Sequence, residues 1–294
     1  MPSQAALPAE PARRPAGGSP AARLSQHYRD FYEQAVSEYD CWAGGVHKQA
    51  AERLVSFIGM QPHMSALDVG CGTGLVTHRL SLAAPDSFVF GIDISPHMLA
   101  VAHTSRPRGS AAVFALMDAD YLLLRSDSFD VVTFGQSLAY LFDADEALRE
   151  AYRVLRPGGR LAVSCQRRKL STAAENVFFA ELTRLADKVP LEIPRPPKER
   201  AWFGEPEVLR KLLQKAGFRN VETTQLLTGN HTTDAQGWIS LMRFAGPYPH
   251  ALLSHLGPAL RTHFLKRLEH AVGQLSQESF RYHRAFTFAV ARKP

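Results

Sequence analysis

The sequence has few cysteines and no long apolar run. Its 294 residues include three cysteines, Cys41, Cys71 and Cys165, with no Cys-x-x-Cys pair and no cysteine/histidine spacing typical of zinc sites. Neither a disulfide scaffold nor a metal site is therefore indicated, and a reducing, cytoplasmic setting is favoured. No stretch of about 18 uncharged apolar residues occurs, so membrane insertion by a helix is not expected.

The charge balance is basic. With 34 Lys+Arg against 28 Asp+Glu, the formal net charge is +6, which is compatible with nucleic acid or with an acidic substrate. Residues 1–22 are mostly Ala, Pro, Gly and Ser, and their prolines prevent a regular helix, so a disordered tail is predicted there. Arg13 and Arg14 lie in this tail, which weakens the case for a nucleic-acid partner.

Short apolar runs alternate with helical patterns through most of the chain. Five such runs, followed later by two more, are predicted to be strands: 66–69, 88–92, 111–116, 129–134, 160–164, 221–227 and 282–291. Strand and helix alternating at this spacing predict an α/β fold with a parallel sheet.

One domain is predicted over 23–294. Helices at 24–42 and 46–58, separated by Gly44-Gly45, form its N-terminal part over 23–60. A core over 61–165 follows. The regions 166–203 and 229–279 interrupt the strand–helix rhythm and are expected to be helical caps.

A glycine-rich loop joins the first strand of the core to its helix. Gly70, Gly72 and Gly74 allow the backbone to turn tightly and to approach a ligand without an intervening Cβ. The spacing is not the G-x-G-x-x-G of dinucleotide sites, because residue 75 is leucine, and no Gly-Lys-Ser/Thr of a phosphate loop follows.

Carboxylates end the next two strands. Asp93 closes the second strand about twenty residues beyond the loop, where an acidic side chain accepts hydrogen bonds from ribose hydroxyls. Asp118 follows the third strand, where it can accept from an adenine amino group. Glycine loop and strand-end carboxylates in this order point to a ligand that contains adenosine.

Residues 67–163 resemble the class I S-adenosylmethionine-dependent methyltransferases, in particular the small-molecule branch that includes ubiquinone/menaquinone-biosynthesis-type enzymes. The motifs that carry the resemblance are 67–74, 91–95, Asp118-Ala119, 129–132 and 153–161. The resemblance implies an enzyme with S-adenosyl-L-methionine as cofactor. It also implies a Rossmann-like, seven-stranded, mostly parallel sheet with helices on both faces and an antiparallel last strand.

The resemblance further implies which residues contact the cofactor. The glycines would face its methionine part, Asp93 its ribose, Asp118 its adenine amine, and Gln136 would lie below the sulfonium. The implied set is Tyr39, Asp68, Gly70, Cys71, Gly72, Thr73, Gly74, Asp93, Ile94, Met98, Asp118, Ala119 and Gln136.

The two caps are expected to roof the acceptor site, since ligands bind at the carboxyl ends of the strands in such sheets. Their aromatic residues suit an apolar acceptor, and their arginines suit a phosphate or carboxylate on it, although the same rings could form the caps' own core. The predicted acceptor contacts are Tyr28, Tyr140, Phe179, Arg195, Trp202 and Trp238.

Methyl transfer from a sulfonium requires alignment and exclusion of water, and a base only where the acceptor must lose a proton. His231 and Glu175 are the candidate bases, and no metal is expected. The sequence thus predicts C- or O-methylation of a small, largely apolar metabolite, such as a prenyl (possibly diphosphate), quinone-like or polyketide-like molecule.

Two alternatives remain. A nucleic-acid methyltransferase acting on amino groups usually has Asn/Asp-Pro-Pro-Tyr after the fourth strand, where residues 135–138 here read Gly-Gln-Ser-Leu. A non-catalytic partner protein that has kept the cofactor fold is the other alternative. The sequence does not predict the oligomeric state.

Overall fold

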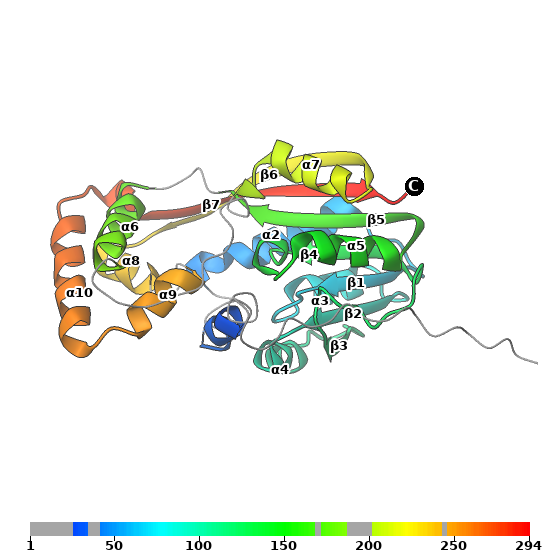
Figure 1. The fold of residues 1–294 in the computed structure, drawn as a ribbon, viewed down its shortest axis with the longest axis horizontal. Helices are drawn as coiled ribbons and strands as arrows, with labels where there is room; N and C mark the ends of the chain where they lie inside the picture. The colour runs from blue at the N-terminus through cyan, green and yellow to red at the C-terminus, as the bar shows by residue number, and fades with distance from the viewer. Residues whose placement is uncertain (1–25, 35–41, 168–171, 187–201, 243–245) are drawn as a thin grey trace, which may run out of the picture.

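The computed structural model describes residues 26–34, 42–167, 172–186, 202–242 and 246–294 (Figure 1). The predicted tail at 1–22 and the candidates Tyr39 and Arg195 lie outside the described residues.

A seven-stranded sheet forms the centre of the molecule. Its strands, in the spatial order β3-β2-β1-β4-β5-β7-β6, are β1 (Ser65–Val69), β2 (Phe88–Asp93), β3 (Val113–Leu116), β4 (Phe129–Gly135), β5 (Leu155–Gln166), β6 (Arg219–Thr232) and β7 (Arg281–Arg292). Strands β1 to β5 pair in parallel, whereas β7 is antiparallel to both β5 and β6. The predicted mostly parallel sheet and its antiparallel last strand are confirmed.

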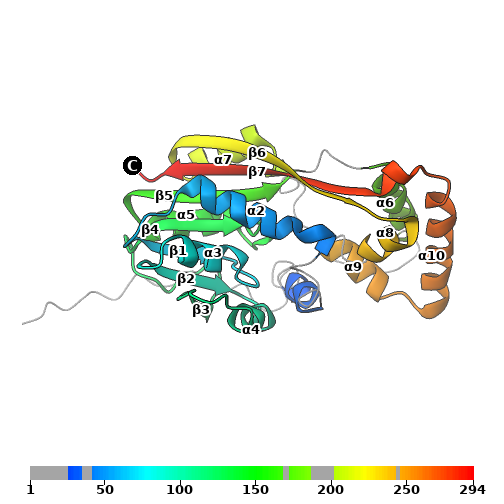
Figure 2. The same ribbon diagram turned by 180° about the vertical axis from the view of Figure 1, so that it is seen from behind.

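Helices cover both faces of the sheet, as predicted. One face packs against α2 (Trp42–Ile58) and α3 (Leu75–Ala83), and the other against α5 (Ala144–Val154) and α7 (Pro206–Lys215). In the view from behind, α2 and α3 lie on the side of the sheet that faces the reader (Figure 2). A separate apolar core lies under each face, so the sheet is buried on both sides, as expected for parallel strands.

Local signals place the helices that follow the strands. The helix α4 (Pro96–Thr104) begins after Ser95, whose Oγ accepts from the Met98 N–H, with Pro96 in the first turn. Asp143 caps α5 by accepting from the Glu146 N–H at 2.9 Å. These caps fix where each helix starts relative to the carboxyl end of the preceding strand.

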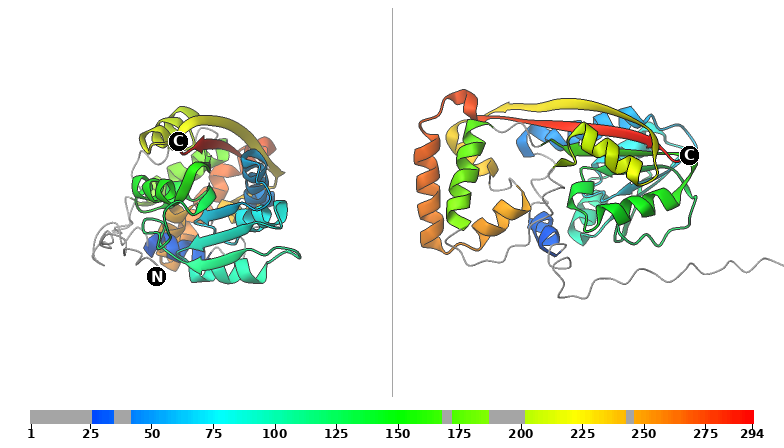
Figure 3. Two further views of the ribbon diagram at one scale, coloured as in Figure 1. Left: turned by 90° about the vertical axis from the view of Figure 1, so that its right-hand side faces the viewer. Right: turned by 45° about the horizontal axis from the view of Figure 1, so that its top comes forward.

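Strands β6 and β7 continue beyond the rest of the sheet and carry a helical lobe. The lobe consists of α6 (Ala173–Ala186), α8 (Ala235–Met242), α9 (Pro247–Ser254) and α10 (Pro258–Val272), and it lies at one end of the molecule (Figures 1 and 3). It has an apolar core of its own, built around the rings of Phe178, Trp238, Phe264 and Phe280. Residues of both predicted cap regions therefore pack into one unit.

Several boundaries differ from the prediction, among them that of β6, which runs over 219–232 in place of 221–227. Helix α2 begins at Trp42 and runs through Gly44-Gly45, so the glycine pair lies within a helix instead of separating two. Strand β5 begins at Leu155 and not at Arg160, because Phe129 pairs with Leu155 and Val131 with Arg160, which leaves 156–159 as a bulge.

Trp238 is expected to be far more important for stability than Trp202. Trp238 has no exposed surface and contacts Phe178 and Phe280, whereas Trp202 is 44% exposed. Trp238→Ala should therefore destabilise the protein by about 3–5 kcal/mol, and Trp202→Ala by no more than about 0.5 kcal/mol. Urea unfolding of the two variants measures both, and equal losses would contradict the assignment of Trp238 to the lobe core.

Candidate functional site

The glycine loop is a tight turn held against the neighbouring strands. Gly70 has a φ of +68°, and a Cβ on it would lie 2.5 Å from the Cβ of Ser137, so the loop packs directly on the end of β4. The Cys71 N–H donates to the carbonyl of Ile92 at 2.9 Å, which joins the loop to β2. The predicted loop thus lies at the carboxyl ends of β1, β2 and β4.

Asp93 joins the loop to the start of α4. Its Oδ2 accepts from the Gly72 N–H at 2.8 Å, and its Oδ1 accepts from the Ser95 N–H at 2.9 Å. Burial raises the pKa of Asp93 above its ordinary value, while these amide donors oppose the rise. The carboxylate is therefore fixed at the edge where the predicted ribose contact belongs.

Asp68 lies beneath the loop and is 1% exposed. Its two oxygens accept from the hydroxyls of Thr77 and Thr133, both at 2.7 Å, so that it connects β1 with α3 and β4. Burial raises the pKa of Asp68 to about 6.

Asp68→Asn should change how stability depends on pH. Because the pKa of Asp68 is about 6 in the folded protein and about 3.9 in an unfolded chain, its contribution is complete below about pH 4 and is lost as the pH rises through 6. The wild type should thus lose up to about 3 kcal/mol relative to Asp68→Asn between pH 4 and 7. Urea unfolding of both proteins across this range measures the difference, and a constant difference would contradict it.

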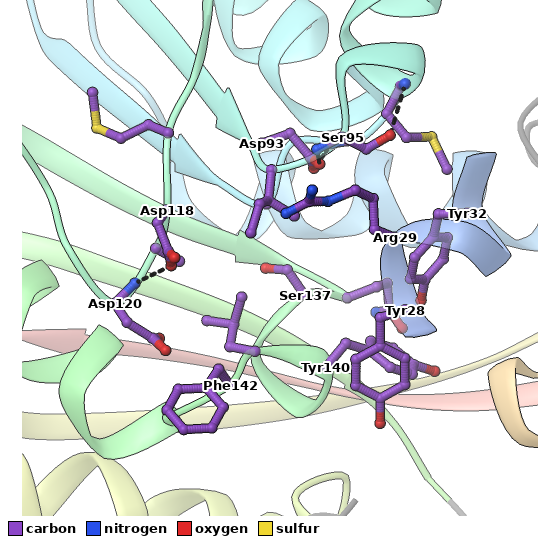
Figure 4. A pocket seen from close by; sticks show the side chains of 18 of the residues that line it. Tyr28, Arg29, Tyr32, Asp93, Ser95, Asp118, Asp120, Ser137, Tyr140 and Phe142 are labelled. Atoms are coloured by element: carbon purple, nitrogen blue, oxygen red, sulfur yellow. Dashed lines mark hydrogen bonds between the residues drawn. The ribbon is translucent and has the colours of Figure 1, made fainter. Parts of the chain in front are cut away.

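A pocket opens at the carboxyl ends of β1, β2 and β4, above the loop (Figure 4). The structure brings together in its wall most of the predicted cofactor residues and two predicted acceptor residues: Gly70, Gly72, Asp93, Ile94, Met98, Asp118, Ala119, Gln136, Tyr28 and Tyr140. Met117, Leu141 and Phe142 add apolar surface.

A second, smaller cavity lies behind the loop. It shares Gly70, Gly72, Gly135 and Gln136 with the main pocket, and the remaining predicted loop residues except Gly74 line it: Asp68, Cys71 and Thr73. Gly74 lines neither cavity. It precedes α3 with a φ of +83°, and a Cβ there would approach the His78 ring to 2.9 Å.

Gln136 lies between the two cavities in an unusual conformation. Its φ is +64°, which is rare for a residue other than glycine. Its side-chain Nε2 donates to Ser164 Oγ at 2.8 Å, which fixes the amide next to the glycine loop. Backbone strain in a residue that lines two cavities is typical of a residue that contacts a ligand.

The helix over residues 26–34 covers the main pocket. Tyr28 and Tyr32 each contact the Tyr140 ring edge-on, at centroid distances of 5.7 and 5.9 Å. On its other side Phe31 contacts His250 of α9, with centroids 5.2 Å apart. The 26–34 helix therefore connects the pocket wall with the helical lobe.

The other predicted residues lie elsewhere. Glu175 is buried at the start of α6, where its Oε1 accepts from Arg284 at 2.6 Å and its Oε2 accepts from the Thr172 N–H. Phe179 and Trp202 are exposed, Trp238 lies in the lobe core, and none of these four residues lines either cavity. Strand β6 includes His231, opposite Tyr282 of β7, but the His231 side chain lies outside what the structure describes.

Several pocket residues were not predicted. Arg29, Tyr32 and Ser137 line the main pocket, and His47 lines the second cavity. Burial, together with the charge of Arg284, lowers the pKa of His47 to about 4, so that this imidazole is neutral at pH 7. The one available signal for Arg29 and Tyr32 was their place on an amphipathic helix, which does not by itself indicate a binding role.

Within the described part of the chain, no group of three or more His, Cys, Asp or Glu side chains is arranged to hold a metal ion. None of the helices described is both long and apolar enough to cross a membrane.

A family model described as a methyltransferase domain matches residues 67–163. A malonyl-[acyl-carrier protein] O-methyltransferase of Hahella chejuensis is 37% identical over 137 residues, 46% of this chain, and the match spans about half (48%) of that relative's length. The corresponding enzyme of Geobacter sulfurreducens is 31% identical over 66% of this chain and 70% of its own length. A ubiquinone/menaquinone biosynthesis C-methyltransferase of Vibrio vulnificus is 29% identical over 71% of this chain and 84% of its own.

Solved structures show the same fold. A chain from the Haloferax volcanii complex between the Trm112 methyltransferase activator and a methyltransferase matches 92% of this chain and 97% of its own length, with a TM-score of 0.56 and 18% identity. The Haemonchus contortus phosphoethanolamine N-methyltransferase 2 matches 91% of this chain and 60% of its own, with a TM-score of 0.53 and 19% identity.

The glycine loop and the two strand-end carboxylates fit the methionine and adenosine parts of the cofactor. The chain belongs to the class I S-adenosylmethionine-dependent methyltransferases.

Proposed function

We propose that this methyltransferase transfers the methyl group to a small, largely apolar acceptor, by C- or O-methylation. The observation that carries the proposal is the composition of the main pocket beside the glycine loop. Its wall combines Met98, Met117, Leu141 and Phe142 with the rings of the three tyrosines Tyr28, Tyr32 and Tyr140. Apolar and aromatic surface of this kind suits a small apolar ligand. Four charged residues also line the pocket, Arg29, Asp93, Asp118 and Asp120, of which Asp93 and Asp118 are the predicted cofactor contacts.

The residues divide between cofactor and acceptor. Asp93 would accept from the ribose hydroxyls and Asp118 from the adenine amine, while Gly70 and Gly72 let the backbone approach the methionine part. The cofactor supplies a methyl group that is already activated on a sulfonium. The protein's task is to align the acceptor and to exclude water, and the 26–34 helix, packed on Tyr140 and on α9, would do so.

The relatives' names support both types of acceptor atom, since one acts in C-methylation and the others in O-methylation. Among acceptors, prenyl, quinone-like and polyketide-like molecules fit the apolar wall. If the acceptor must lose a proton, His231 is the proposed base, because both oxygens of Glu175 are already held by hydrogen bonds from Arg284 and Thr172.

The test is transfer of a labelled methyl group from S-adenosylmethionine to four panels: quinols, phenols, prenyl diphosphates and apolar carboxylic acids. We expect turnover with at least one panel and none with tRNA or DNA. Binding of S-adenosylhomocysteine without transfer to any panel would favour the non-catalytic alternative instead. Turnover with nucleic acid would overturn the proposed acceptor class.

A further inference from the structure

Helix α2 brings a histidine to the place where the two cavities meet. The helix begins at the end of the sheet that faces the lobe (Figures 1 and 2). His47, in its second turn, lines the second cavity together with Gly70, Gly72 and Gln136, which this cavity shares with the main pocket. It is the one histidine among the described residues that line either cavity. Its imidazole therefore lies beside Gln136, the residue expected below the sulfonium.

The packing of α2 on the last two strands fixes the position of this ring. Two residues further along the helix, Gln49 accepts a hydrogen bond from the hydroxyl of Thr228 on β6. Thr228 lies opposite Arg284 of β7 in the sheet, and Arg284 is buried in an ion pair with Glu175 of α6. His47 is therefore held at the junction of the sheet, the lobe and the two cavities.

The surroundings of His47 keep its ring neutral. Burial and the nearby guanidinium of Arg284 lower the pKa of His47 to about 4. Asp68, the one carboxylate among the described residues that line the same cavity, is engaged by the hydroxyls of Thr77 and Thr133. A neutral imidazole carries one N–H donor and one acceptor nitrogen, and it does not repel the sulfonium cation of the cofactor.

These properties suit a hydroxyl group on the acceptor. A hydroxyl can donate to the acceptor nitrogen of the ring or accept from its N–H. An anion would meet no lysine or arginine among the described residues that line this cavity, and the charge of Arg284 is offset by Glu175. The apolar body of the acceptor would then lie against the wall of the main pocket, which includes the ring of Tyr140.

We propose that His47 binds a hydroxyl group of the acceptor by a hydrogen bond and so orients the acceptor at the junction of the two cavities. The inference rests on the proposed function and specifies its acceptor as an apolar molecule with a hydroxyl group, such as a phenol or a quinol. A ring with a pKa of about 4 is a weak base at neutral pH, so the role of His47 is orientation, and removal of a proton is left to His231.

Calorimetry on the full chain saturated with S-adenosylhomocysteine tests this contact. The probes are para-propylphenol and para-propyltoluene, in which a methyl group replaces the hydroxyl. We expect the wild type to bind the phenol at least about tenfold more tightly, because a polar group that loses its partner in a closed site weakens binding. His47→Phe should weaken the phenol at least about tenfold and leave the toluene and S-adenosylhomocysteine unchanged.

Two further variants make the test specific. His47→Gln keeps a donor and an acceptor on its amide, so its affinity for the phenol should stay within about threefold of the wild type. His103→Phe is the control, because His103 lies on α4 next to Phe114, lines neither cavity and should change none of these affinities. Melting temperatures show that each variant is folded.

Three results would overturn the contact: a wild type that binds both probes equally, a His47→Phe protein that prefers the phenol as the wild type does, or a His47→Gln protein that loses as much affinity as His47→Phe. Weaker binding of S-adenosylhomocysteine by His47→Phe would place the ring on the cofactor and overturn it as well. A wild type that binds S-adenosylhomocysteine but neither probe would overturn the proposed apolar acceptor, and this inference with it.

Discussion

Gly72→Ala is expected to weaken cofactor binding about 100-fold while the protein remains folded. Gly72 lines both cavities, and a Cβ built on it meets no protein atom within 4 Å, so the added methyl group would occupy space that the ligand needs. Its φ of +54° adds a backbone penalty of about 1 kcal/mol. Calorimetry with S-adenosylhomocysteine measures the affinity, and thermal unfolding measures the stability.

Gly158→Ala is the matched control. Gly158 has a φ of +77°, and a Cβ on it also meets nothing within 4 Å, but it lies in the bulge of β5 and lines neither cavity. Gly158→Ala should lower the free energy of unfolding by about as much as Gly72→Ala does. It should leave the affinity for S-adenosylhomocysteine unchanged. Equal affinities of the two variants would show that the methyl group on Gly72 does not meet the ligand.

The centre of the fold was predictable because its signals are local. Each buried parallel strand, such as 129–134, is a short apolar run followed by its own helix signal, and the structure has β4 at Phe129–Gly135. The last strand was likewise predicted, at 282–291, and β7 lies at Arg281–Arg292, but the extension of β6 from 227 to Thr232 was not predictable in this way. From the sequence alone, the side chain of Arg284 is expected to be exposed to solvent. In the structure it is buried, and it pairs with Glu175, which lies 109 residues away in the chain.

The same distinction applies to the site. Glycine spacing and the strand-end carboxylates Asp93 and Asp118 are short-range patterns, and the structure brings these residues into one pocket. The composition of the caps could not predict that Trp238 is buried in the lobe core whereas Trp202 is exposed. Arg29 reaches the pocket because the 26–34 helix packs on Tyr140, a contact between segments more than a hundred positions apart that no local pattern encodes.

Asp93→Asn should also reduce cofactor affinity by about 100-fold or more. Hydrogen bonds to a charged group contribute about 1.5–3 kcal/mol each, and the two ribose hydroxyls would lose a carboxylate acceptor. The new amide group would in addition face the N–H of Gly72 or of Ser95, which now donate to Asp93 at 2.8 and 2.9 Å, and so disturb the loop itself. Calorimetry with S-adenosylhomocysteine and with adenosine measures the loss, which should be similar for both because both carry the ribose.

Asp130→Asn separates the ribose contact from the general effect of removing a strand-associated carboxylate. Asp130 lies on β4, accepts from the Ser65 N–H at 2.8 Å and pairs with Arg156, but it lines neither cavity. This variant should lose some stability and keep its affinity for both ligands. If Asp93→Asn bound adenosine as tightly as the wild type, the ribose would lie elsewhere, and the carboxylate of Asp93 would act only by holding Gly72 and Ser95 in place.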